Sequence, residues 1–340
     1  MHDDSGQMSI DFLIGFTVFL IAFIFVATLS SGLFINLQSK TIDYDAVAYR
    51  TGVILAEDPG YAFDPTINTN TTRWELLDTL YIDRTIRFGL AISKDYPNIL
   101  SKGKVQSFFT NGYGFSKDDY KSRLIFGDYP YRFNITLKSV GGSTEYPTPS
   151  VADDATYLQK YGYIRRVVDI KEPGDAVFAL PDPAFATSPI VNISIGFEDL
   201  YDTERGDIYR LRPLDETIVI NITNFNGRTL NDIKFNGNIP PMPPDISPTI
   251  EIYKNTATKD PTKRVVLGTT GINNLLLFID PRYTRQFMGQ DDSAGKISLN
   301  LTFDQPVVST SQFTYTYNNA ADTVITPPYL VPAVMEVKIW

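Results

Sequence analysis

The N-terminal part of the chain is a long apolar segment. From Phe12 to Ile35 no residue is charged, and the residues before it, Met-His-Asp-Asp at the very start, carry no Lys or Arg. As a helix the segment would be about 36 Å long at about 1.5 Å per residue, and the hydrocarbon core of a bilayer is about 30 Å thick. The pattern therefore predicts a transmembrane helix.

An amphipathic pattern follows the apolar segment. Apolar residues recur at the spacing of one helix face, at Ile42, Ala46, Tyr49 and Val53. The Asp-Pro-Gly sequence at 58–60 then ends the pattern, because proline and glycine do not continue a helix. We predict that residues 7–57 form an N-terminal transmembrane and amphipathic helix.

Beyond about residue 124 the pattern changes to strict alternation. In "YRFNITLK", Tyr131, Phe133, Ile135 and Leu137 share one face of a strand. The same alternation occurs in "VNISIGF", "TIEIY", "KISLNLTF", "QFTYTY" and "MEVKIW", and Pro- and Gly-rich joints separate these segments. Short alternating strands joined by turns favour antiparallel sheets in a β-sandwich.

These patterns define the fold class and the domain organisation. We predict an α+β protein with a long N-terminal transmembrane helix followed by a β-rich, β-sandwich extracellular body. The expected units are a leader peptide at 1–6, the helix at 7–57, a helix-packed mixed region with the first strands at 58–150, and the β-rich body at 151–340.

Composition narrows the chemistry that the folded body can perform. The 340 residues are 43% hydrophobic and 20% charged, with a net charge of −9, which disfavours nucleic acid as a partner. There is no cysteine, and the single histidine is His2 in the leader. Cysteine nucleophiles, His-containing triads and His or Cys zinc sites are thereby excluded, so we expect no enzyme, no metal site and no cofactor. Paired carboxylates of the glycosidase type stay open, because their separation cannot be read from sequence.

The residues around the start of the apolar segment have a specific order. The stretch "GQMSIDFL" places Gly6, Gln7, Ser9 and Asp11 directly before an apolar helix. It resembles the processing site of archaeal type IV pilin-like proteins with a class III signal peptide. In that family a membrane peptidase cuts before Gln, and the mature chain begins Gln-x-Ser-x-acidic. The resemblance implies cleavage between Gly6 and Gln7 by a signal peptidase of the prepilin type.

Asp11 has two interpretations. Ser9 as an N-cap and Asp11 in the first turn would both favour the positive end of the helix dipole. The resemblance instead implies that the new α-amine of Gln7 meets Asp11 of a neighbouring subunit inside an apolar helix bundle, which makes Asp11 an assembly contact. A conventional signal peptide cut near Ser31 is a further alternative.

Five Asn-x-Ser/Thr sequences are candidates for N-glycosylation. They begin at Asn70, Asn134, Asn192, Asn221 and Asn300. In four of them Asn and the hydroxyl residue flank an apolar residue, which puts both on the polar face of a strand. They could carry a surface coat of glycans, or they could be ordinary outward-facing polar residues.

The function that these observations favour is that of a structural cell-surface protein. We expect a pilin-like subunit, large for its class and either a minor or a tip component. Its partners would be the prepilin-type signal peptidase, other pilin subunits through the N-terminal helix, and the membrane. It would lie in the cell membrane as a single-pass protein with its body outside, and at the cell surface or in an extracellular filament after processing. The alternatives are a membrane-anchored adhesin or binding protein, and an anchored hydrolase that uses carboxylates.

Overall fold

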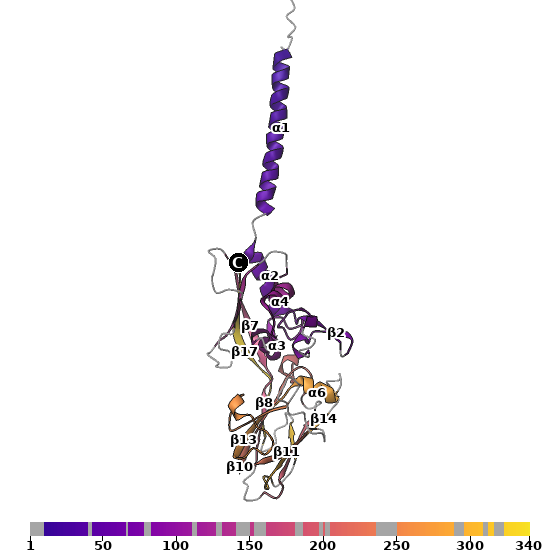
Figure 1. The fold of residues 1–340 in the computed structure, drawn as a ribbon, viewed down its shortest axis with the longest axis vertical. Helices are drawn as coiled ribbons and strands as arrows, with labels where there is room; N and C mark the ends of the chain where they lie inside the picture. The colour runs from indigo at the N-terminus through magenta and orange to yellow at the C-terminus, as the bar shows by residue number, and fades with distance from the viewer. Residues whose placement is uncertain are drawn as a thin grey trace, which may run out of the picture.

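A long helix extends from a body with two hydrophobic cores (Figure 1). The computed structural model describes residues 10–39, 43–65, 67–77, 83–110, 114–126, 131–140, 150–152, 161–180, 186–196, 200, 205–235, 250–288, 296–308, 312–315 and 323–340. We call the half of the body next to the long helix the proximal lobe and the far half the distal lobe. The fold is α+β with a β-rich body of several sheets.

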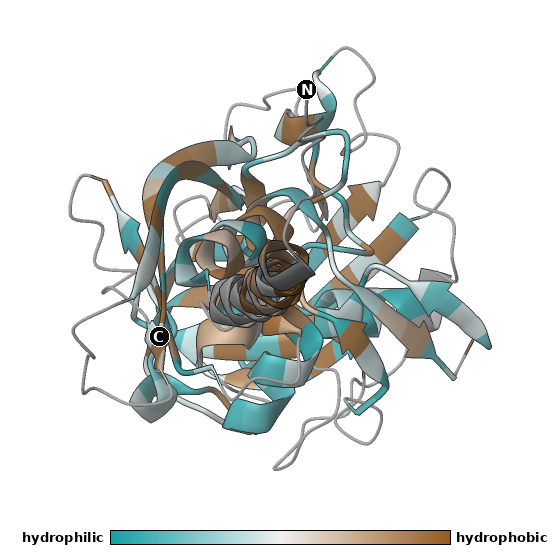
Figure 2. Ribbon diagram, turned by 90° about the horizontal axis from the view of Figure 1, so that it is seen from above, coloured by the Kyte–Doolittle hydropathy of each residue, from teal (hydrophilic) through white to brown (hydrophobic). Residues whose placement is uncertain are grey.

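Helix α1 (Ile10–Ser39) carries apolar side chains on all sides. In Figure 2, which looks along α1, the helix lies over the middle of the body and its coloured part is mostly brown. Its described side chains, Phe12–Thr28, are exposed throughout. Within the described residues no helix is long and apolar enough to cross a membrane.

Helix α2 (Tyr44–Glu57) begins at its own N-cap. The backbone N–H of Ala46 donates to the Asp43 carboxylate at 3.0 Å, and Asp43 has non-helical backbone angles. The helix ends at Glu57, and its C-cap Asp58 is extended, the conformation favoured for a residue before proline. The helical pattern predicted for 7–57 is therefore carried by two helices, and α2 starts where an Asx cap satisfies its first N–H groups.

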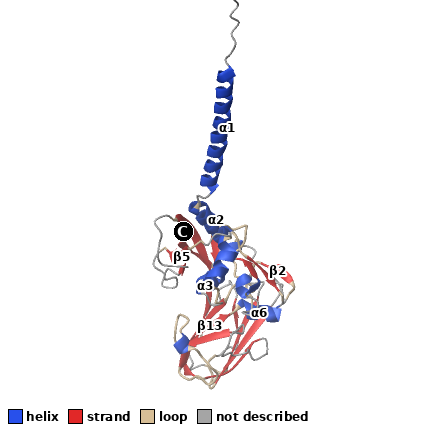
Figure 3. Cartoon of the chain, turned by 45° about the horizontal axis from the view of Figure 1, so that its top comes forward, coloured by secondary structure: helices blue, strands red, loops and turns tan. Residues whose placement is uncertain are grey.

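The proximal lobe packs α2 and several short helices against a five-stranded sheet of order β4-β7-β17-β5-β6, beside a small sheet of order β2-β1-β3. Its remaining elements are β1 (Tyr61–Asp64), β2 (Thr69–Thr71), η1 (Trp74–Leu76), β3 (Thr85–Arg87), β4 (Ile99–Ser101), α3 (Lys102–Thr110), α4 (Lys117–Tyr120), the π-helical turn η3 (Lys121–Ile125), β5 (Phe133–Ser139), β6 (Ser150–Ala152), β7 (Gly162–Glu172) and β17 (Tyr329–Ile339). Figure 3 shows most of the blue helices in this half and mostly red strands in the far half.

The distal lobe has two sheets, of order β12-β13-β10-β8-β16 and β11-β14-β9-β15, which share one core. Ile220 and Leu277 enter that core from the first sheet, and Ile193 and Leu299 enter it from the second. The elements are β8 (Asp175–Ala179), β9 (Ile190–Gly196), η5 (Asp207–Tyr209), β10 (Ile218–Arg228), β11 (Leu230–Phe235), β12 (Ile250–Lys254), η6 (Pro261–Lys263), β13 (Ile272–Ile279), α6 (Pro281–Met288), β14 (Lys296–Phe303), β15 (Gln312–Tyr315) and β16 (Thr323–Thr326).

The predicted strands are confirmed, but the cores divide the chain differently from the predicted ranges. Strand β7 lies beyond residue 151 and still belongs to the proximal core, as does the last strand, β17. The chain crosses between the lobes after β7 and returns before β17. At the crossing Gly174 has φ +74°, and a Cβ there would lie 2.1 Å from the carbonyl oxygen of Thr326. The two connections therefore touch, and only glycine fits between them.

Candidate functional site

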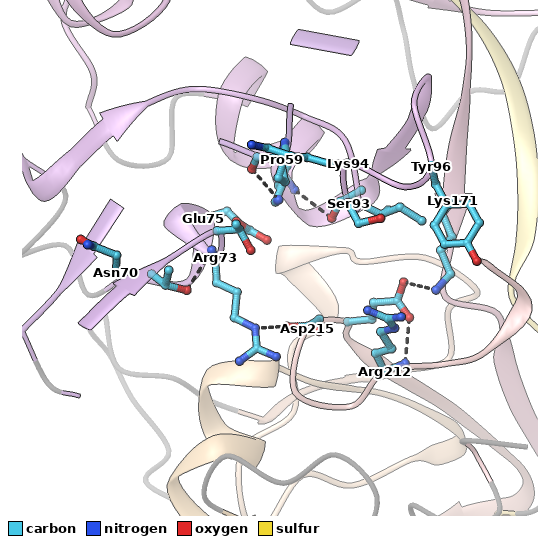
Figure 4. Close-up of a pocket in the computed structure, with 16 residues that line it drawn as sticks. Pro59, Asn70, Arg73, Glu75, Ser93, Lys94, Tyr96, Lys171, Arg212 and Asp215 are labelled. Atoms are coloured by element: carbon cyan, nitrogen blue, oxygen red, sulfur yellow. Dashed lines mark hydrogen bonds and ion pairs between the residues drawn. The ribbon is translucent and has the colours of Figure 1, made fainter. Parts of the chain in front are cut away.

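A charged cavity of about 500 Å³ lies where the two lobes meet (Figure 4). The proximal lobe supplies the wall around β2, η1, the loop at 92–96 and the start of α3. The end of β7 and the turn at 212–216, just before β10, supply the opposite wall. Figure 4 shows Asn70 at one end and Tyr96 beside Lys171 at the other, with Arg73 and Glu75 between them. The cavity has the size of a site for a small ligand.

Lys104 and Glu75 are two buried titratable groups on the proximal wall that interact electrostatically. Lys104 is 3% exposed, and its ammonium donates to the carbonyls of Pro59 at 2.6 Å and Ala91 at 3.1 Å. Burial lowers the pKa of Lys104, which the nearby Glu75 partly offsets. Burial raises the pKa of Glu75, 5% exposed, and Lys104 acts in the opposite direction. Each group is therefore displaced toward its neutral form, as desolvation requires.

A second pair joins β7 to the turn of the distal lobe. The Lys171 ammonium lies 2.7 Å from Glu216 Oε1 and also donates to the carbonyl of Arg210 at 2.7 Å. The other oxygen of Glu216 accepts from the backbone N–H of Arg212 at 2.9 Å. The turn is thus held by both oxygens of one carboxylate, which fixes the shape of this wall.

A third group of charged residues joins the two lobes. Arg73 Nε of the proximal lobe pairs with Asp215 of the distal lobe. Arg285 on α6 supports the same turn, because its Nε donates to the carbonyl of Leu214 at 2.9 Å and its guanidinium lies 3.5 Å from Asp215. Burial lowers the pKa of Arg285, with Arg73 as a further cause. The cavity is therefore preformed by ion pairs between the lobes.

Sequence reasoning missed this cavity. Its pairs join residues far apart in the chain, so no local spacing indicates them. The signal present was Lys104, which shares the buried face of α3 with Val105 and Phe108. A lysine on the apolar face of a helix is costly to bury and suggests a specific partner.

The predicted processing site falls outside the described residues. Gly6, Gln7 and Ser9 precede the first described residue, Ile10. Asp11 is the second residue of α1, and its side chain also lies outside what is described. Cleavage and the assembly contact therefore stay predictions.

The sequons occupy strands, as their alternation predicts. In four of them the central residues, Ile135, Ile193, Ile222 and Leu301, are fully buried, and the preceding asparagines, on the opposite side of their strands, are only partly exposed. Asn192 and Asn300 are direct partners on neighbouring strands. Asn70 is exposed on β2 and also lines the cavity. The structure thus places Asn70 near the charged pairs, Asn192 and Asn300 side by side on one sheet, and Asn134 and Asn221 on two other sheets. Glycosylation itself stays a prediction.

Comparison with known proteins found a matching family model and a distant relative. Residues 3–80 match a family model described as "Family of unknown function (DUF7287)". A curated relative, an "Uncharacterized protein" of Archaeoglobus fulgidus, is 29% identical over 145 residues, which cover 40% of this chain and 71% of the relative. No solved structure matches the chain.

Proposed function

We propose that this protein is a structural cell-surface protein, a pilin-like subunit assembled through its N-terminal helix. One observation carries the proposal: α1 exposes large apolar side chains on every side of its described part, and Figure 1 shows it extending away from the body. Phe19 and Phe25 are each 65% exposed, and Ile21 and Val26 are each 63% exposed. A helix that is apolar all round needs an apolar environment.

Two apolar environments can surround α1, and the helix of a pilin-like subunit occupies them one after the other. Lipid would surround the helix before assembly, and helices of other subunits would surround it afterwards. The sequence supports the first stage, because the uncharged run continues past the described side chains to Ser39. The transmembrane character of α1 is part of this proposal.

The resemblance at Gly6, Gln7, Ser9 and Asp11 supports the second stage. A cut before Gln7 would create an α-amine with an ordinary pKa of about 7.7–8.0. In the proposed filament that amine and Asp11 of a neighbouring subunit compensate each other in an apolar bundle. The matched family model, a family of unknown function, spans this region, and the relative is an uncharacterized protein of Archaeoglobus fulgidus.

The body fits a role outside the cell. The distal lobe has two sheets around one core, the arrangement of a β-sandwich. We propose that the body faces outward from the membrane, that the prepilin-type signal peptidase and other pilin subunits are its partners, and that glycans occupy some of the sequons. In the filament the protein would serve as a minor or tip component.

The mature N-terminus tests the proposal. Full-length protein is isolated from its native membrane or filament fraction, and its first residue is determined by mass spectrometry. We expect a chain that starts at Gln7, and we expect Gln7→Ala and Ser9→Ala variants to stay uncut. His2→Ala, a change within the leader away from the cut, is the matched control and should be processed normally.

Other N-termini would overturn the proposal in distinct ways. A chain that starts at Met1 would indicate a fixed anchor, which is the adhesin alternative. A start near Gly32 would indicate a secreted protein in which Asp11 is only a first-turn helix residue.

A further inference from the structure

The cavity between the lobes has more positive than negative side chains on its walls. Three carboxylates line it, from Glu75, Asp215 and Glu216, and each has a cation beside it in Lys104, Arg73 and Lys171 respectively. Lys94 and Arg212 are two further cations on the same walls. Arg212 also lies 3.2 Å from Asp207, outside the cavity lining. The lining therefore carries five cationic side chains and three carboxylates, although the protein has a net charge of −9.

Three of the charged groups at the cavity are deeply buried. The side chains of Lys104, Lys171 and Glu75 are between 2% and 5% exposed. Burying a charge costs free energy unless partners compensate it, and a fold needs no cavity to satisfy an ion pair. An ammonium has three N–H groups, and two of those on Lys104 donate to the Pro59 and Ala91 carbonyls. One donor remains for Glu75 or for a molecule in the cavity.

The rest of the lining is rich in neutral hydrogen-bonding groups. Asn70, Thr72, Ser93 and Ser101 contribute amide and hydroxyl groups, and Tyr96 contributes an aromatic ring with a polar tip. Such groups exchange hydrogen bonds with hydroxyls, and an aromatic face can pack against the C–H face of a sugar ring. Most small-molecule sites are lined by apolar side chains with a few convergent polar groups, whereas this lining is mostly polar or charged, which favours a polar ligand.

We propose that the cavity between the lobes binds an acidic sugar, a hydroxyl-rich ring that carries one carboxylate. The carboxylate is held by the cationic wall, with Lys94 at the rim closing over it. The ring hydroxyls bond to the neutral side chains of the proximal wall, and Tyr96 packs against the ring. This site lies in the body, so the proposal is independent of how α1 is processed or assembled.

The test measures binding of D-glucuronate to the full-length chain in detergent by isothermal titration calorimetry, with D-glucose and inorganic phosphate as comparison probes. We expect D-glucuronate to bind at least about tenfold more tightly than either, because glucose lacks the carboxylate and phosphate lacks the ring. Equal binding of glucose would overturn the role of the cationic wall. Phosphate binding as tightly as glucuronate would show a simple anion site and overturn the assignment to sugar.

Rim variants separate binding from folding. Lys94 is exposed, so Lys94→Ala should leave the melting temperature of the unliganded protein unchanged while weakening glucuronate binding about tenfold. Tyr96→Ala should weaken binding of glucuronate, and Lys138→Ala, an exposed lysine on β5, is the matched control with wild-type affinity. If no probe binds, or if Lys94→Ala binds like the control, the cavity is only a hydrated junction and the proposal is wrong.

Discussion

Lys171 on β7 and Glu216 in the turn before β10 form an ion pair across the junction of the lobes, with 2.7 Å between Nζ and Oε1. The lysine side chain is 2% exposed and that of Glu216 is 14% exposed, so water screens the pair little. The pair ties the end of β7, in the proximal lobe, to the turn that precedes β10 in the distal lobe. The stability of the junction should depend on it.

Replacing Lys171 should destabilise the protein. Lys171→Met keeps the apolar stem but leaves the Glu216 carboxylate and the Arg210 carbonyl without the ammonium. Removing one partner of a buried pair costs about 3 kcal/mol or more. Urea unfolding followed by tryptophan fluorescence checks this loss, and Lys138→Met on the exposed face of β5 should cost little.

The paired nature of the interaction has its own test. In the double variant Lys171→Met/Glu216→Gln the uncompensated charge is gone, so we expect it to recover part of the loss. If the double variant is instead destabilised by the full sum of the two single variants, Lys171 and Glu216 do not act as a pair.

Glu75 should make stability depend on pH. Burial raises its pKa above the ordinary 4.5. Between 4.5 and its folded-state pKa the folded protein holds a proton that the unfolded chain has lost, so stability falls as pH rises through that window. Lys104, Asp215 and Arg285 act on Glu75 as well, and of these Asp215 also raises its pKa.

Glu75→Gln removes the titrating group, so the variant should lack this loss of stability with rising pH. The free energy of unfolding of the variant minus that of the wild type should increase from pH 4.5 to about pH 7. Loss of the carboxylate would lower the pKa of Lys104 further, which contributes with the same sign. Urea titrations at both pH values measure the difference. A difference that is constant with pH would mean that Glu75 titrates alike in both states.

Gly162 lies where β7 comes close to the start of α2. A Cβ built there would lie 1.9 Å from the carbonyl oxygen of Tyr44. Gly162→Ala must therefore push the strand and the helix apart, at a cost of at least about 2 kcal/mol. At Gly206 the nearest atom to a new Cβ is a ring carbon of Tyr209 at 3.7 Å, so Gly206→Ala is the matched control. Thermal unfolding of the two variants gives the comparison, and equal melting temperatures would contradict the contact.

Local alternation predicted the strands because burial of one face leaves a period of two in the sequence. Phe133, Ile135 and Leu137 are all fully buried on β5, and the residues between them are not. The sequence shows no comparable pattern for which strands pair with each other. β17 is the last strand, yet it lies between β7 and β5, and β8 pairs in parallel with β10. These choices depend on contacts between distant segments, which periodicity does not encode.

The cavity was unpredictable for the same reason. Arg73 and Asp215 are brought together only when both lobes have formed, and neither residue is unusual in its local sequence. Lys104 was detectable in principle, since it interrupts the apolar face of α3. The first residues of the chain are the opposite case. There a local sequence motif predicts a function, but the motif lies outside the part of the chain that the structure describes.

Asp11 should matter for assembly and not for cleavage, if the proposed function holds. Asp11→Asn removes the charge that would compensate the α-amine of a neighbouring subunit, and an amine left alone in an apolar bundle is strongly disfavoured. We expect the variant to be cut before Gln7, to stay in the membrane fraction and to be absent from sheared filaments, whereas Asp11→Glu restores the charge and should assemble. Asp4→Asn, in the leader that is removed, is the control and should resemble the wild type. As a first-turn residue alone, Asp11 would contribute only about 0.3–1 kcal/mol to its helix, and Asp11→Asn would then enter filaments at wild-type levels.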